Sequence, residues 1–182
     1  MLSIRLKPNK NTFICYPMRM FLACTLIISL LACSETASEQ KLKSWIFDHE
    51  ELLTPAEENY LDSIIRNHVI KTSNEIAIVT TPNYGSDSSM FDYSLQYGEK
   101  IGLGKAGKNN GVLIAISAQK RSIFIQNGYG IENVFSDWQT KQIIDSLIIP
   151  HMKNASYFEG LRAGTSAIIA HLEKPENRVK AE

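Results

Sequence analysis

Oxygen-bearing side chains are the candidates for chemistry in this sequence, and they gather around two glycine-containing stretches. "GLGKAGKN" (102–109) is followed at once by a second Asn, and "GYGIEN" (128–133) contains a carboxylate. Carboxylate, amide and carbonyl oxygens are the ligands that hard cations such as Ca²⁺ and Mg²⁺ prefer. The candidate ligands for such a cation are Asp48, Asn109, Asn110, Glu132 and Asp137.

The same residues also have a purely conformational interpretation. Asn-Asn-Gly and Gly-Tyr-Gly are typical of turns with left-handed backbone conformations. Asp137 follows Ser136 at the start of a predicted helix, where a carboxylate is favourable without any metal. Both interpretations stay open at this point.

Neither glycine stretch has the context of a nucleotide site. "GLGKAGKN" differs by one residue from a P-loop, which must follow a strand, open a helix and carry Ser or Thr where Asn109 stands. Here a helix is expected before it and a strand after it. "GYGIEN" has Asn133 in place of the third glycine of a dinucleotide fingerprint, and its preceding strand belongs to a hairpin. We therefore expect no nucleotide.

Other catalytic and binding patterns are also missing from the sequence. It contains no G-x-S-x-G and no H-E-x-x-H motif, and its His residues (49, 68, 151 and 171) form no ligand-spaced pair. His68 and His171 fall near apolar helix stripes and are expected at the core edge, whereas His49 and His151 are expected in solvent. With 19 basic and 19 acidic side chains and no basic stripe, we expect no nucleic-acid partner.

The elements that position these residues follow from hydrophobic periodicity. Helical spacing and capping signals predict helices over about 55–71 and 89–101, and two C-terminal helices separated around Pro150, the second capped by Ser156. Nearly continuous β-branched runs predict buried strands at 75–81 and 112–117, and "SIFIQN" predicts an antiparallel partner at 122–127. The expected fold class is α/β, with a small mixed sheet sandwiched between helices.

This order of elements predicts where the candidate ligands lie. In a parallel pair with an appended hairpin, the strands near 75 and 112 begin where the strand near 127 ends. Asn109, Asn110, Glu132 and Asp137 should therefore converge at that end of the sheet, and we expect Asp48 to join them from the loop before the first helix.

The N-terminus has the pattern of a targeting segment. Met18-Arg19-Met20 precedes the apolar run "FLACTLIISLLA", which has the length of a signal-peptide core. The run ends at Cys33 in "LLAC", which resembles a bacterial lipobox, and Cys24 is less well placed for this. We predict a lipid on Cys33 and a translation start at Met18 or Met20. An ordinary cleaved signal or an anchor helix is the alternative.

The domain boundaries follow. Residues 1–32 are the predicted signal segment, 33–44 a lipidated tether, 45–173 the folded domain and 174–182 a polar tail. All three Cys (15, 24 and 33) lie at or before the predicted lipidation point, so the domain contains no thiol nucleophile or disulfide. The expected location is the extracytoplasmic side of the cell envelope, with the outer membrane favoured because Ser34, not Asp, follows the Cys.

Read together, these motifs resemble the TPM domain family, which includes a thylakoid-lumen acid-phosphatase-like protein and photosystem II repair proteins. The resemblance rests on "NNG" before the central strand, "GYGIE" after the next strand, and Ser136-Asp137 at a helix start, and it covers about Trp45 to Leu172. It implies an α/β sandwich, a membrane-held extracytoplasmic domain, and divalent-cation binding in some members.

Two classes of function fit the sequence. The first, which we favour, is a lipid-anchored binding or assembly module for an envelope protein partner, with Ca²⁺ or Mg²⁺ at the glycine-rich end of the sheet. The second is a metal-assisted acid phosphatase, as the resemblance suggests. A phosphatase normally presents a cationic clamp for phosphate, and this loop offers only Lys105 and Lys108, which we expect to be solvated.

Overall fold

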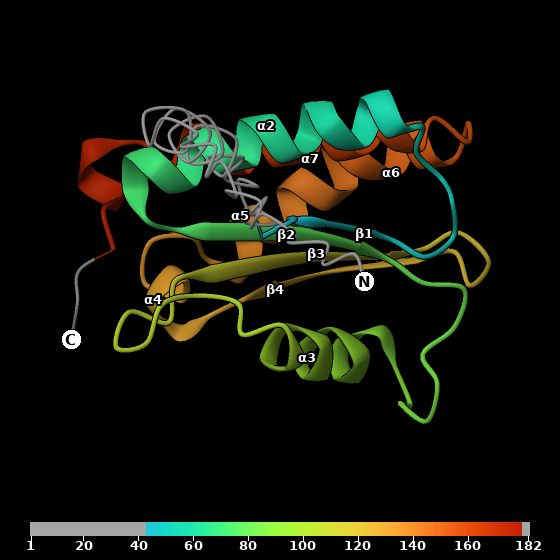
Figure 1. Cartoon of the computed structure of the whole chain (residues 1–182), viewed down its shortest axis with the longest axis horizontal. Coiled ribbons are helices and arrows are strands. Elements are labelled where there is room, and N and C mark those ends of the chain that lie inside the picture. Colours follow the sequence, from blue (N-terminus) through green and yellow to red (C-terminus); the bar gives the residue numbers. More distant parts are fainter. Residues whose placement is uncertain (1–42, 180–182) are drawn as a thin grey trace, which may run out of the picture. The chain divides into compact units, whose positions relative to one another are not determined.

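The computed structural model describes residues 43–179. Its centre is a pair of parallel strands, β2 (Glu75–Thr80) and β3 (Gly111–Ser117), in which every residue is buried. β4 (Ser122–Asn127) pairs antiparallel with β3. The three predicted strands and the mixed sheet are thereby confirmed, and helices lie on both sides of the sheet (Figure 1).

A fourth strand, β1 (Ile46–Asp48), completes the sheet in the order β1-β2-β3-β4. The sequence pattern does not reveal it, because three residues are too few to display a period of two. β1 pairs parallel with β2 and places Asp48 beside Thr80. The carboxyl end of β1 therefore lies where β2 ends, not where β2 begins.

Two long helices, α2 (Pro55–Thr72) and α7 (Tyr157–Leu172), cover one face of the sheet, and α3 (Met90–Lys100) covers the other (Figure 1). α2 begins with a capping box, in which the Thr54 side chain accepts from Glu57 N–H. The core between sheet and helices is aliphatic and includes Leu61, Ile65 and Ile168, each fully buried.

The C-terminal helical region departs from the prediction. α5 (Asp137–Ile143), the π-helical turn η1 (Ile144–Ile148) and α6 (Ile149–Met152) follow one another without a break. Pro150 is tolerated near the start of α6 because the wide turn before it already departs from the α-helical bonding pattern, with Ile149 N–H bonded to Ile144 O. The break comes instead at 153–156, and Ser156 makes no side-chain cap.

Two short elements complete the described part of the chain, α4 (Tyr129–Glu132) and the 3₁₀ helix η2 (Pro175–Asn177). Among residues 43–179, none of the helices combines the length and the apolar character that a membrane crossing needs. The predicted signal segment, Cys33 and the tether up to residue 42 lie outside the described residues.

Candidate binding site at the glycine-rich pole

The end of the sheet at which β2 and β3 begin and β4 ends is called the glycine-rich pole below. The loop 101–110 leaves α3 and enters β3 there, the reverse of a P-loop. Gly104 lies in this loop with φ +94°, and its N–H donates to Glu75 at 2.9 Å. Lys105 N–H donates to the Asn110 side-chain oxygen at 2.8 Å. The side chains of Glu75 and Asn110 therefore fix the conformation of the loop.

The second glycine stretch packs directly on this loop. A Cβ on Gly130 would lie 1.9 Å from Lys108 O, and one on Gly128 would lie 2.3 Å from Asn109 O, so neither position has room for a side chain. Gly130 N–H instead donates to Asn109 O at 3.1 Å. Glycine is required at both positions because the two backbones touch.

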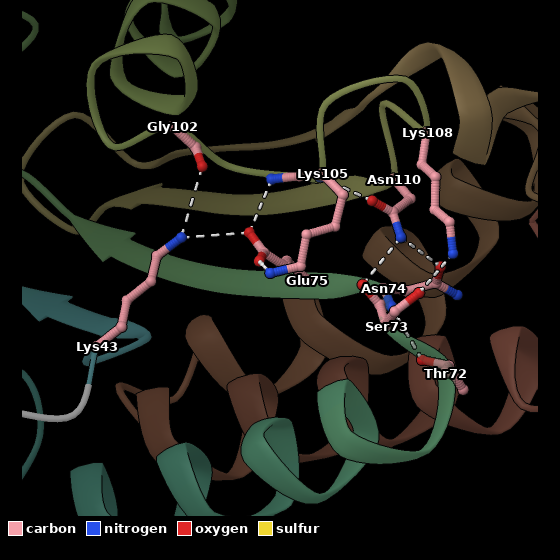
Figure 2. A network of polar contacts seen from close by, with 10 residues as sticks. Lys43, Thr72, Ser73, Asn74, Glu75, Gly102, Lys105, Lys108 and Asn110 are labelled. Carbon is pink, nitrogen blue, oxygen red and sulfur yellow. Dashed lines mark hydrogen bonds and ion pairs between the residues drawn. The ribbon is translucent and has the colours of Figure 1, made fainter. Parts of the chain in front are cut away.

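Asn110 is wholly buried, and its side chain is part of this framework. Its Oδ1 accepts from Lys105 N–H, and its Nδ2 donates to Ser73 O at 2.9 Å and to Asn74 Oδ1 at 3.0 Å (Figure 2). The expected ligand role of Asn110 therefore has no support from its geometry. Asn109 is exposed at φ +47°, with its carbonyl bonded to Gly130.

Glu75 is a buried carboxylate that the sequence analysis missed as part of the pole. It is 3% exposed and contacts Lys105 Nζ at 2.8 Å and Lys43 Nζ at 3.2 Å (Figure 2). Burial alone would raise the pKa of Glu75, but the hydrogen bonds from Lys105, Gly104 and Lys43 outweigh it and hold the pKa below its ordinary value. The carboxylate is therefore charged and ties the loop to the start of β2.

Two cavities adjoin the pole. The first, of about 640 Å³, lies between α3, the loop 101–110 and the end of β4, and its lining includes Asn109, Tyr129 and Glu132. The second, of about 490 Å³, lies against β4 and α5, and its lining includes Glu132 and Asp137. Glu132 lines both cavities and is exposed, as is Asp137. Three of the five predicted ligands, Asn109, Glu132 and Asp137, therefore line cavities at one end of the sheet.

Two amide side chains at the end of β4 join this group, and the sequence analysis missed both. Gln126 and Asn127 line both cavities, and Gln126 Oε1 and Asn127 Oδ1 are buried with no hydrogen-bond partner in the described part of the chain. The Asn127 amide is held in place because its Nδ2 donates to Thr140 Oγ1 at 3.0 Å. The sequence feature that could have indicated them is the pair of amide residues at the end of the otherwise apolar run "SIFIQN".

Asp48 lies at the opposite end of the sheet, so the expectation that it joins the pole is wrong. The register pairs it with Thr80, five residues along β2 from Glu75, or about 16 Å at ~3.3 Å per residue. Its carboxylate accepts from Leu53 N–H at 2.8 Å and from the Thr80 hydroxyl. Asp48 therefore holds the turn between β1 and α2.

The histidines do not form a metal centre. His68 is 1% exposed and His171 Nε2 lies 2.6 Å from Val134 O, so both are packed against the core as predicted. His49 is exposed, as predicted, and contacts the Tyr97 hydroxyl at 3.1 Å, whereas His151 is half-buried. Within residues 43–179, no group of three or more His, Cys, Asp or Glu side chains is arranged to hold a metal ion.

Three bacterial proteins are among the solved structures with the same architecture. The N-terminal domain of a protein from P. gingivalis is 27% identical (TM-score 0.66, covering 79% of this chain and 90% of that one). The BA42 protein from the psychrophilic bacterium Bizionia argentinensis is 25% identical (TM-score 0.60, 71% and 90%). An N-terminal domain from Corynebacterium glutamicum, 11% identical (TM-score 0.56, 74% and 83%), shows the shared fold only.

The family comparison agrees with these structures. No match to a curated protein was found. The family model described as the TPM domain matches residues 46–171, a span that runs from β1 to α7 and so includes the whole sheet, the helices on both of its faces and the glycine-rich pole. This chain therefore belongs to the TPM domain family.

Proposed function

We propose that this TPM domain is an extracytoplasmic binding module whose glycine-rich pole holds a divalent cation, Ca²⁺ or Mg²⁺. The ligands would be the carboxylates of Glu132 and Asp137 with the amide oxygen of Asn127, whose side chain is held on the α5 side of β4 by Thr140, and Asn109 lies at the rim of the first cavity. These are the hard oxygen donors that such cations take.

The observation that carries the proposal is the buried, unpartnered amide oxygen of Asn127, which lines the second cavity together with Glu132 and Asp137. A buried acceptor without a partner costs about 1–3 kcal/mol, and a bound cation would remove that cost. The neighbouring carboxylates of Glu132 and Asp137 enter no ion pair within residues 43–179, so their charge is available to a cation.

Calorimetric titration of the full chain in detergent with Ca²⁺, and separately with Mg²⁺, tests this proposal. We expect saturable binding that weakens about tenfold or more, at least ~1.4 kcal/mol, in Asp137→Asn and in Glu132→Gln. Glu176→Gln is the matched control, because Glu176 is exposed in η2 and lines neither cavity. Absence of binding at millimolar cation, or equal binding by all three variants, would refute the cation site.

The pole geometry favours binding over phosphate hydrolysis. Lys105 and Lys108 are the basic residues of the loop 101–110, and both hold structure. Lys105 pairs with Glu75, and Lys108 Nζ donates to Ser73 Oγ at 3.1 Å. A phosphate clamp would need such cations free to meet the developing charge. Turnover of an aryl phosphate in Ca²⁺, Mg²⁺ or Mn²⁺ that disappears in Asp137→Ala would instead support the phosphatase.

The proposal places the domain at a membrane through a lipid on Cys33, with the outer membrane favoured. Its support is the lipobox-like "LLAC" sequence, which lies outside the described residues. Metabolic labelling with a radioactive fatty acid should mark the wild type and Cys24→Ala but not Cys33→Ala. Label retained in Cys33→Ala would contradict lipidation at this residue.

A further inference from the structure

β4 is an edge strand, and its outer edge carries backbone groups without partners. In an antiparallel ladder, the N–H and C=O groups of alternate residues point toward the neighbouring strand and those between them point away. Gly128 N–H donates to Gly111 O at 2.9 Å, which fixes this alternation along β4. The N–H and C=O of Ile123 and Ile125 therefore face the open edge, where no hydrogen bond within residues 43–179 engages them.

The open edge lies beside a hollow. The second cavity, of about 490 Å³, is lined by residues 124–127 of β4, by Phe91 of α3 and by Ile144 of η1. Phe91 is 47% exposed, so its ring leaves apolar surface free at the rim. Proteins usually protect an edge strand with a charge or a proline within it, and "SIFIQN" contains neither. This edge is therefore open to another strand.

At the end of the edge near Asn127, the charges without an ion-pair partner among the described residues are acidic. The lysines that line the two cavities, Lys105 and Lys141, are already paired with Glu75 and Asp145. Glu132 and Asp137 form no ion pair among the described residues, and Asn127, whose buried Oδ1 has no hydrogen-bond partner there, also lines the second cavity. An occupant that complements this surface brings hydrogen-bond donors and positive charge.

We propose that β4 receives an extended segment of a partner protein, which adds as a fifth strand and places a Lys or Arg side chain against Glu132 and Asp137. Main-chain bonds to Ile123 and Ile125 would supply affinity, and the acidic pair would supply the preference for a basic side chain. This inference rests on the proposed binding function and names the chemistry of the partner. The basic side chain and the divalent cation then compete for the same carboxylates.

Synthetic strands test the proposal on the full chain in detergent, in EDTA. The probe is a capped eight-residue peptide of alternating Val and Lys, compared with a Val and Glu peptide of the same length and with a Val and Lys peptide N-methylated at alternate amides. We expect the unmethylated Val and Lys peptide to bind at least tenfold more tightly than either comparison peptide. Ca²⁺ should weaken its binding, and the double variant Glu132→Gln with Asp137→Asn should reduce its preference for Lys over Glu.

A protein variant gives an independent check on the edge. Ile123→Pro removes an edge-facing N–H that the β3 ladder does not use, whereas Ile123→Ala shortens the same side chain and keeps the N–H. Binding of the Val and Lys peptide should fall at least tenfold only in Ile123→Pro. Failure of Ile123→Pro to fold leaves the methylated peptide as the deciding comparison.

The results of the Ca²⁺ and peptide titrations distinguish the proposed strand pairing from the proposed cation site. Ca²⁺ binding without peptide binding overturns the strand proposal alone, and peptide binding without Ca²⁺ binding overturns the cation site alone. Equal affinity for the Lys and Glu peptides, or for the methylated and unmethylated peptides, also overturns the strand proposal. A dimer by light scattering that Ile123→Pro dissociates would identify the occupant as a second copy and overturn it as well.

Discussion

Glu75 is a buried charge at the first position of β2, and two lysines from distant parts of the chain hold it. Because Lys43 and Lys105 are each about half exposed, the stabilisation comes mainly from the short charged hydrogen bonds and not from a buried ion pair. The interaction ties the beginning of the domain, the central strand and the pole loop together. A residue that reads as part of an apolar strand is thus the anchor of the pole.

Replacing this anchor should lower stability in a pH-dependent way. Glu75→Gln should cost about 1.5–3 kcal/mol at pH 7, the usual value for hydrogen bonds to a charged group. The pKa of Glu75 is lowered in the folded state from 4.5, so its stabilisation is present above that value and disappears as pH falls through the folded pKa. Urea unfolding should show the difference from wild type shrinking as the pH falls below 4.5. A constant difference would contradict the assignment.

Two glycines provide a matched pair for the close contact at the pole. Gly130→Ala places Cβ 1.9 Å from Lys108 O and should destabilise by about 3 kcal/mol, the upper range for overpacking, while displacing the loop. Gly98→Ala lies inside α3, where the added Cβ would lie 3.9 Å from Leu113 Cδ2, and should stabilise by about 0.5–1 kcal/mol through helix propensity. Thermal unfolding of both variants checks the contrast, which equal shifts would refute.

At the scale of elements, the sequence predicts the long periodic segments well and the short ones poorly. The strands near 75, 112 and 122 and the helices near 55 and 89 match the structure, because each carries enough residues to display its period. β1 and α4 are too short for that. The sequence pattern does not reveal β1, and the position of Asp48 at the far end of the sheet depends on the pairing of β1 with β2. The predicted place of Asp48 in the site is wrong for this reason.

The candidate site could be predicted only as far as topology determines it. Strand order brings Asn109, Glu132 and Asp137 to one end of the sheet, and this expectation holds. Whether an amide side chain is hydrogen-bonded through both of its ends, as in Asn110, or keeps an oxygen without a partner, as in Asn127, depends on packing that sequence periodicity does not encode.

The contact between α2 and the end of α7 predicts a second pH effect. The His68 side chain is buried, with Nδ1 3.3 Å from Glu173 Oε1 and Nε2 3.3 Å from Thr72 Oγ1, and Lys71 also pairs with Glu173. Burial lowers the pKa of His68 from 6.5, and the hydrogen bond and charge of Glu173 offset this only in part. The folded protein therefore binds this proton less readily than the unfolded chain.

Stability should consequently fall as pH decreases from above 6.5 through the folded pKa of His68, because the unfolded chain gains a proton first. His68→Gln keeps hydrogen-bonding capacity and cannot titrate. Its free energy of unfolding, measured in urea between pH 8 and pH 5, should depend on pH less steeply than that of the wild type. Parallel curves for the two proteins would show that another group is responsible.

In the domain as a whole, the two ends of the sheet differ. The polar side chains at one end hold the fold, whereas the other end also carries the groups that we propose to bind a ligand. Where β1 and β2 end, Asp48 and Glu50 bind backbone N–H groups of neighbouring turns and hold the fold. Where β2 and β3 begin, Glu75 and Asn110 hold the loop, and Asn109 and Glu132 line an open cavity. A ligand at the pole can therefore bind without breaking an interaction that the described fold needs.

Such a ligand should stabilise the whole domain. A cation that binds only the folded state adds about 2.7 kcal/mol at a free concentration one hundred times its Kd, which corresponds to a rise in Tm of roughly 10 °C for a domain of this size. Calorimetric scans of the wild type should show this rise with Ca²⁺ or Mg²⁺ and its reversal by EDTA. The rise should nearly vanish in Asp137→Asn and persist in Glu176→Gln, because only the first of these side chains lines a cavity at the pole. An equal rise in both variants would mean that the cation acts elsewhere on the protein.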